Sequence, residues 1–149
     1  MFIKPLNRRR DEDGFTLIEL LVVVVILGIL IGIAIPVYLN YRKSANDKAA
    51  QSDLRNAVAT LEVCNSENGA YPTSVTTNAD NGACTGQRIN VSTNTTVAYT
   101  GTATAYSMVS NNSGGSGKWY CYNSTKGGSV AALSPNPATE AAAKTACAA

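Results

Sequence analysis

One carboxylate stands at the start of an otherwise apolar stretch of the chain. Glu19 precedes the run from Leu20 to Tyr41, in which two tyrosines are the only other ionisable side chains. A run of about 20 apolar residues is long enough for a helix to cross a bilayer. An acid in such a span costs on the order of 2 to 3 kcal/mol at the bilayer centre and less toward an end. Because this cost must be offset, Glu19 is the first candidate functional residue of the sequence.

The segment before the apolar run is charged and ends at a small residue. Residues 1–14 carry four basic side chains, then three acidic ones, and finish with Gly14. A secretory signal has the opposite order, with its apolar core before the cleavage site. A cut after Gly14 would therefore remove the charges and leave the apolar helix on the mature chain. The four basic residues also outnumber Arg42 and Lys43 after the run, which favours an N-terminus in the cytoplasm.

The start of the apolar run resembles a known processing signal. Residues 14–19 read Gly-Phe-Thr-Leu-Ile-Glu, and with the apolar helix after them they resemble the class III signal of type IV pilins and type II secretion pseudopilins. The resemblance covers residues 14–45, with a looser match at residues 68–73. It implies that a prepilin peptidase in the membrane cuts between Gly14 and Phe15 and N-methylates Phe15. The leader is longer than in many members of the family.

Cleavage would give Glu19 a specific electrostatic role. The new amine on Phe15 would lie about one helical turn from the carboxylate, and a charge pair is far stronger in low dielectric than in water. The attraction can act within one subunit or between neighbours. The resemblance implies the second, in which Glu19 of an incoming subunit pairs with the Phe15 amine of the last subunit added. The alternative is that Glu19 marks the interfacial end of a simple single-pass anchor.

Three residues in the apolar run are expected to weaken its helix. Gly28, Gly32 and Pro36 recur every fourth position and so share a face. Small residues at this spacing let helices approach closely in membranes, while proline and glycine destabilise a helix. The resemblance implies that residues 28–36 loosen when subunits assemble. The alternative is that the glycines simply face lipid.

The composition excludes several kinds of site. The chain has no histidine, which rules out histidine-based triads and removes the commonest transition-metal ligand. After Asp80 the only acidic side chain is Glu140, so no calcium site is expected in the C-terminal half. By the resemblance, many major pseudopilins have such a site, and its absence favours a pilin. We expect no enzyme activity, metal, cofactor or nucleic-acid partner.

The cysteines predict a disulfide framework. All of them lie beyond the apolar run, at Cys64, Cys84, Cys121 and Cys147. Four cysteines in an exported domain predict two disulfides, with three possible connectivities. We favour Cys64–Cys84, which would pin the following loop to the first helix, and Cys121–Cys147, which would tie the C-terminal tail to a strand. A zinc site built from all four thiolates is the alternative, and it lacks a CxxC pair.

After Tyr41 the apolar pattern becomes that of an amphipathic helix. Apolar residues recur at spacings of four, three, four and three, at Ala50, Leu54, Ala57, Leu61 and Cys64. Five charged residues lie off this stripe: Asp47, Lys48, Asp53, Arg55 and Glu62. We expect the first four to be solvated, and the alternative is that they form bridges between subunits. The helix should continue from the membrane without a break and stop before residues 68–69.

Strand signals follow the second half of the helix. Residues 71–100 are expected to form a loop with short extended pieces at 88–91 and 96–99. Strands are predicted at 103–110 and 118–122, joined by a flexible hairpin connection at 111–117, and a further strand at 129–133. Residues 140–144 favour a short helix or turn near Cys147.

The aromatic residues of this region admit two interpretations. They are Tyr99, Tyr106, Trp119, Tyr120 and Tyr122. Because side chains alternate between the two faces of a sheet, we expect packing in the core rather than a binding surface. The predicted fold class is α+β, the type IV pilin fold, in which one long N-terminal helix packs on a small antiparallel sheet.

These elements divide the chain into three expected parts. Residues 1–14 are the leader, 15–41 the transmembrane and assembly half of the helix, and 42–149 the soluble head domain. Within the head, residues 42–66 continue the helix, 67–100 form the loop region, and 101–149 form the sheet and the disulfide-bonded tail.

The resemblance implies a structural function. A major pilin begins as a single-pass protein of the cytoplasmic membrane with its N-terminus inside, and then polymerises into an extracellular helical filament for adhesion and motility. The implied partners are other copies, the prepilin peptidase, a platform membrane protein and minor pilins. Two alternatives stay in the family: a major pseudopilin of type II secretion and a competence pilin that captures DNA. The second would need a basic tip, and the chain beyond residue 60 offers only Arg88, Lys118, Lys126 and Lys144.

Overall fold

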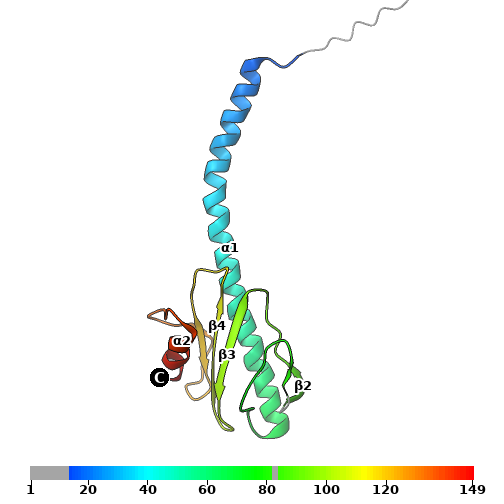
Figure 1. Ribbon diagram of the computed structural model, residues 1–149, viewed down its shortest axis with the longest axis vertical. Helices are drawn as coiled ribbons and strands as arrows, with labels where there is room; N and C mark the ends of the chain where they lie inside the picture. The colour runs from blue at the N-terminus through cyan, green and yellow to red at the C-terminus, as the bar shows by residue number, and fades with distance from the viewer. Residues whose placement is uncertain (1–13, 82–83) are drawn as a thin grey trace, which may run out of the picture. The chain divides into compact units, whose positions relative to one another are not determined.

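The computed structural model describes residues 14–81 and 84–149 (Figure 1), so most of the expected leader, residues 1–13, lies outside the described residues. The elements in chain order are α1 (Leu17–Asn68), β1 (Asp80–Asn81), β2 (Cys84–Arg88), β3 (Thr95–Gly101), β4 (Tyr106–Asn112), β5 (Tyr120–Asn123), β6 (Ala131–Ala132) and α2 (Glu140–Ala148). Contacts divide the chain into a unit that ends at Tyr38 and a head unit, Leu39–Ala149. The predicted α+β class is confirmed.

Helix α1 runs for 52 residues without interruption, as the sequence predicts. The most apolar 18-residue stretch of this helix has a mean hydropathy of 3.2, and none of its residues is buried. By length and composition the helix can therefore cross a membrane. Pro36 lies inside the helix although its ring removes a backbone hydrogen bond. The helix is intact from Gly28 to Pro36 in this structure, so loosening of this segment stays a prediction for the assembled state.

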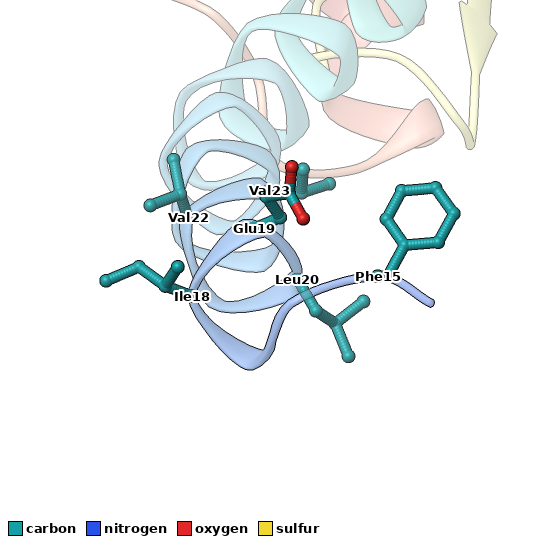
Figure 2. A pocket seen from close by; sticks show the side chains of 6 residues that line it. All are labelled: Phe15, Ile18, Glu19, Leu20, Val22 and Val23. Carbon is teal, nitrogen blue, oxygen red and sulfur yellow. The ribbon is translucent and has the colours of Figure 1, made fainter. Parts of the chain in front are cut away.

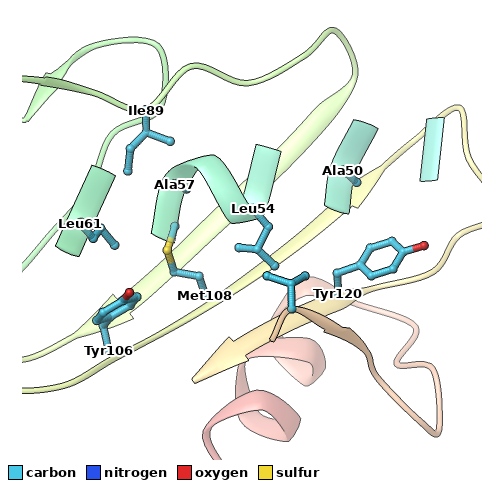
Figure 3. Close-up of a cluster of buried hydrophobic side chains, with 9 residues drawn as sticks. Ala50, Leu54, Ala57, Leu61, Ile89, Tyr106, Met108 and Tyr120 are labelled. Carbon is cyan, nitrogen blue, oxygen red and sulfur yellow. The ribbon is translucent and has the colours of Figure 1, made fainter. Parts of the chain in front are cut away.

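The second half of α1 packs its apolar stripe on one face of the sheet. Ala50, Leu54, Ala57 and Leu61 are at most 1% exposed, and they form one cluster with side chains that include Tyr106 and Met108 of β4 (Figure 3). Complete burial of a side chain such as Leu54 contributes about 1.5 to 3 kcal/mol. The period-3.6 pattern therefore predicted this face of the helix correctly.

The main sheet has the strand order β3-β4-β5-β6, and every neighbouring pair is antiparallel. The hairpin predicted from residues 103–110 and 118–122 is confirmed as β4 and β5, with Met108 opposite Tyr122. The expected strand at 129–133 is reduced to the two residues of β6.

The loop region contains more strand than the sequence indicates. The piece expected at residues 96–99 is part of β3, a seven-residue strand that pairs along its whole length with β4. The piece expected at 88–91 is wrong: the strand is β2, which ends at Arg88 and pairs with β1 in a separate two-stranded sheet. Pairing with a neighbouring strand, more than the β-propensity of the residues themselves, extends the backbone in these segments.

The opposite face of the main sheet is covered by α2. Successive residues of a strand point to opposite faces, so Met108 packs toward α1 while Val109 joins Ala143 and Cys147 of α2. Helix α2 is nine residues long and is capped by Thr139, whose side chain accepts a hydrogen bond from the Ala142 amide. The head thus has three layers: α1, the sheet and α2.

Two disulfides close the head, and their pairing is the one favoured from the sequence. Cys64–Cys84 and Cys121–Cys147 have Cα–Cα distances of 5.3 and 5.6 Å and sequence separations of 20 and 26 residues. In the chain-entropy account, loops of this length are each worth about 3 kcal/mol. With every cysteine in a disulfide, the alternative of a zinc–thiolate site is wrong.

Candidate functional site

The start of α1 is held by reciprocal hydrogen bonds between Thr16 and Glu19. The Thr16 amide and hydroxyl donate to Glu19 Oε2 at 2.8 and 2.7 Å, and the Glu19 amide donates back to the Thr16 hydroxyl at 3.3 Å. This is a capping box, in which a threonine before the helix and an acid three residues later satisfy free backbone donors of the first turn. The carboxylate is thereby drawn toward the N-terminal end of the helix.

The geometry bears directly on the expected role of Glu19. Cleavage before Phe15 would create a charged amine on that residue. The Glu19 carboxylate is hydrogen-bonded to the next residue, Thr16, and is therefore held near the position of that amine. Hydrogen bonds from Thr16 reach only Oε2. The capping box therefore fixes the position of the Glu19 carboxylate, while Thr16 binds only one of its two oxygens.

An exposed apolar surface surrounds this carboxylate. Figure 2 shows Phe15 projecting from the chain just before the helix, with Ile18, Glu19 and Val22 on the first turns. Together with Leu20 and Val23 they line an apolar groove. Phe15 is 90% exposed, and every large apolar side chain from Leu17 to Tyr41 is exposed as well. A patch of this extent marks a surface that lipid or protein covers.

The sequence-predicted residues Gly28, Gly32 and Pro36 lie farther along the same helix. A Cβ at either glycine would have no heavy atom of another part of the described chain within 4 Å, so nothing among residues 14–81 and 84–149 packs against the helix at these two positions. A Cβ at Gly14 would likewise have no described atom within 4 Å. An open backbone is what both a peptidase and a close-packed neighbouring helix require.

Two aspartates of α1 are buried, which corrects the expectation that they are solvated. Asp53 is 6% exposed and accepts from the Ser92 amide at 2.7 Å and the Ser92 hydroxyl at 3.0 Å. Asp47 is 7% exposed and accepts from the amide and the hydroxyl of Ser116. Each carboxylate therefore fastens a loop of the head to the helix.

The connection between β4 and β5 is anchored, not flexible as expected. Its tip is fixed to α1 by Asp47 through Ser116, and by the Asn46 side-chain amide, which donates to the Gly114 carbonyl at 2.8 Å. The Ser113 amide also donates to the Asn94 carbonyl at 3.0 Å. Glycine at position 115 lets the loop backbone pass close to Asp47, and the hydrogen bonds to α1 hold the loop in this conformation.

The aromatic residues pack as the sequence analysis expects. Tyr106 and Tyr120 are buried, and Tyr99, Trp119 and Tyr122 are partly buried against the core. Burial, followed by its hydrogen bond to Glu62, raises the pKa of Tyr106, and burial raises the pKa of Tyr99 to about 12. These side chains stabilise the head, and none of the five is fully exposed.

Glu62 is the charged residue whose role the sequence does not reveal. Its two oxygens accept from the hydroxyls of Tyr106, at 2.7 Å, and Tyr71, at 3.0 Å. The rings of Tyr71 and Tyr106 lie 4.6 Å apart. Glu62 stays exposed to solvent on its outer side, so it combines a fixed geometry with a surface charge.

Within residues 14–81 and 84–149, no group of three or more histidine, cysteine, aspartate or glutamate side chains can hold a metal ion. The capping box was readable from the sequence as Thr-x-x-Glu, whereas the two buried aspartates were not. Their partners are 39 and 69 residues away along the chain.

A comparison with family models matches the same N-terminal segment, and a comparison with known proteins extends the similarity farther along the chain. A family model described as the prokaryotic N-terminal methylation motif matches residues 9–35. The type IV wide pilus major component PilA4 of Thermus thermophilus is 34% identical over 118 residues, which cover 79% of this chain and 86% of that protein.

Shorter similarities reach a second group of proteins. The type II secretion system core protein G of Pseudomonas aeruginosa is 42% identical over 65 residues, 44% of this chain and 46% of that protein. The protein of the same name in Vibrio cholerae is 37% identical over 68 residues, 46% of this chain and 47% of that protein. The match therefore spans about half the length of the secretion proteins, whereas the match to PilA4 runs along most of both chains.

Proposed function

The chain belongs to the type IV pilin family, and from that premise we propose that it is the major structural subunit of a type IV pilus. The observation that carries the proposal is the start of α1, where an acid held by a capping box opens a helix whose apolar surface is exposed throughout. A helix of this kind is stable only in lipid or against other apolar helices. A filament core built from many copies supplies the second environment.

The proposed sequence of events begins with processing. A prepilin peptidase removes residues 1–14 as a leader and N-methylates Phe15. The exposed backbone at Gly14 and the exposed side chain of Phe15 support this, because an enzyme in the membrane must reach both. Before cleavage the chain is a single-pass protein of the cytoplasmic membrane with its N-terminus inside.

Assembly then depends on the charge pair at the membrane face. The Phe15 amine of the last subunit added attracts Glu19 of the incoming subunit, in a low-dielectric setting where an unpaired charge is costly. The apolar halves, residues 15–41, bundle in the filament core, and the heads, residues 42–149, cover its surface. Contacts between unlike surfaces that do not close into a ring give an open fibre.

The partners in this account follow from family membership. They are further copies of the chain, the prepilin peptidase, a platform membrane protein and minor pilins. Adhesion and motility are then properties of the filament and need no catalytic site on the subunit. A pseudopilin of type II secretion is the second candidate, favoured by the similarity to core protein G. The longer match to PilA4 supports the pilin.

The substitution Glu19→Gln tests this function. It removes the charge but keeps a side chain that can accept from Thr16, so the helix start should remain. We expect normal cleavage after Gly14, measured by mass spectrometry of the membrane fraction, with surface filaments reduced to background. Glu140→Gln is the matched control, because it removes a charge from α2 and should leave filaments intact. Normal filament yield from the Glu19→Gln chain would contradict the proposal.

A further inference from the structure

Glu62 brings the phenol groups of two tyrosines together at one carboxylate. Its Oε1 accepts a hydrogen bond from the Tyr106 hydroxyl at 2.7 Å, and its Oε2 accepts one from the Tyr71 hydroxyl at 3.0 Å. The two ring centroids lie 4.6 Å apart, at the short end of the range of about 4.5 to 7 Å for aromatic pairs. Two phenols that share one acceptor and lie in ring contact are positioned to react with each other.

Three separate parts of the chain hold this arrangement in place. Glu62 belongs to α1, Tyr106 begins β4, and Tyr71 lies in the loop after α1. The Tyr71 amide donates to the Ala103 carbonyl at 3.0 Å, which ties that loop to the turn between β3 and β4. Tyr106 is 3% exposed and packs in the core cluster (Figure 3), whereas Tyr71 is partly exposed. One ring is therefore fixed and shielded, and the other is open to a reagent in solution.

The chemistry available to this pair is one-electron oxidation. Burial, followed by the hydrogen bond to Glu62, raises the pKa of Tyr71 and of Tyr106, so both are neutral phenols at neutral pH. A neutral phenol gives up an electron readily only when its proton leaves as well. Glu62 is placed to accept that proton, because it lies within hydrogen-bond distance of both hydroxyls. Since Glu62 is exposed to solvent, it can release the proton and accept a second one.

Two further tyrosines contact Tyr106 in a less favourable way. The ring centroids of Tyr99 and Tyr122 lie 5.9 and 5.7 Å from that of Tyr106, farther than the centroid of Tyr71. The Tyr99 hydroxyl donates to a backbone carbonyl, which is too weak a base to take a proton. Each oxygen of Glu62 already binds one of the other two hydroxyls. Tyr71 is therefore the favoured reaction partner of Tyr106.

We propose that Tyr71 and Tyr106 form an oxidative cross-linking site, at which two equivalents of a one-electron oxidant join the rings as dityrosine. The oxidant is of the class that peroxidases form from hydrogen peroxide. Each phenol gives one electron to the oxidant and its hydroxyl proton to Glu62, which passes the proton to solvent. The two phenoxyl radicals then form one carbon–carbon bond between their ortho positions. The hydrogens on those carbons move to the oxygens as protons when the rings regain aromaticity, so the chain loses two hydrogens overall.

The new bond adds a covalent tie near the end of α1. The disulfide Cys64–Cys84 already joins the last turns of α1 to β2. Dityrosine would join the loop after α1 to the first residue of β4, and thiols do not reverse such a bond. The inference concerns the head alone and goes beyond the proposed filament function, on which it does not depend.

Photo-oxidation of the full chain in detergent tests the proposal. Tris(bipyridine)ruthenium(II), persulfate and visible light generate a small one-electron oxidant in solution. We expect dityrosine fluorescence, a monomeric chain that is lighter by two hydrogens, and a peptide map in which Tyr71 is bonded to Tyr106. The same treatment in denaturant should abolish this preference and distribute the links among the seven tyrosines of the chain.

Substitutions separate the proton acceptor from simple proximity. Glu62→Gln keeps an oxygen that accepts a hydrogen bond but does not take a proton, so cross-linking should slow at least about tenfold. Glu67→Gln is its matched control, at an exposed position of the same helix. Tyr106→Phe should abolish the link to Tyr71, whereas Tyr122→Phe removes the hydroxyl of a more distant ring and should leave the link intact. Circular dichroism measures the folded fraction of each variant.

The outcomes decide the inference without reference to filaments. A Tyr71–Tyr106 link in the wild-type monomer that forms more slowly in Glu62→Gln supports it. Wild-type monomers that gain no link, or whose links lie chiefly at other tyrosines, overturn it, and this map decides even where a variant fails to fold. Cross-linking of folded Glu62→Gln at the wild-type rate also overturns it. Filament yield enters none of these outcomes, so the proposed function stands or falls by its own test.

Discussion

Asp53 on α1 accepts both the amide and the hydroxyl of Ser92, across 39 residues of sequence. The bond fastens the chain just before β3 to the long helix, and Asp47 does the same for the loop between β4 and β5. Both carboxylates are buried, so each depends on its serine for compensation of the lost hydration. These two buried carboxylates thus attach loops of the head to α1 in addition to the apolar stripe.

Replacement of Asp53 by alanine should destabilise the head. The change leaves the Ser92 amide without its acceptor in a partly buried site, for which we expect a loss of about 2 to 3 kcal/mol. The measurement is denaturant unfolding of the full chain in detergent, followed by circular dichroism. Glu67→Ala, at an exposed position of the same helix, should change stability by less than about 0.5 kcal/mol. Equal effects of the two substitutions would argue against the fastening.

Gly115→Ala tests the contact between Asp47 and the β4–β5 loop by introducing a steric clash. A Cβ at this position would meet Asp47 Oδ1 and lie 3.1 Å from the Asn112 carbonyl oxygen. The carboxylate cannot yield easily because Ser116 holds it, so we expect a loss of about 1 to 3 kcal/mol. The cost should shrink in an Asp47→Ala background, since the obstructing group is gone. Strict additivity in that double-mutant cycle would contradict the proposed contact.

The two disulfides should contribute separately to the head. Cys64→Ser with Cys84→Ser, or Cys121→Ser with Cys147→Ser, should each cost about 3 kcal/mol. Loss of Cys121–Cys147 should in addition free α2 from the sheet, because Cys147 anchors that helix in its buried cluster. Limited proteolysis should then cut first near the C-terminus in this variant only. A C-terminus equally resistant in both variants would show that packing alone holds α2.

High pH should weaken the head through its buried tyrosines. Burial raises the pKa of Tyr106 and of Tyr99, so the folded chain keeps their protons where the unfolded chain has lost them. Stability is therefore complete below about pH 10 and falls as the pH rises above that value. The part of the tyrosinate absorbance that is lost in Tyr106→Phe should appear together with unfolding, and this substitution should reduce the slope of stability against pH. Ionisation of Tyr106 well before unfolding would contradict this.

The sequence was informative where neighbouring positions carry the signal. The stripe from Ala50 to Cys64 and the β4–β5 hairpin both follow from local spacing. The buried aspartates do not, because a charge near basic neighbours is normally solvated and their serines lie in distant loops. Strand β2 was missed for a different reason: its residues have little β-propensity, and its backbone is extended by pairing with the neighbouring strand β1.

The central claim is that this chain is a processed filament subunit, and intact mass spectrometry of sheared surface filaments tests it most directly. The account predicts a dominant species that begins at N-methylated Phe15 and is four hydrogens lighter than its reduced form, because it holds two disulfides. The same preparation should show no chain that retains residues 1–14. A chain found only in membranes, either uncut or missing from filaments, would contradict the account.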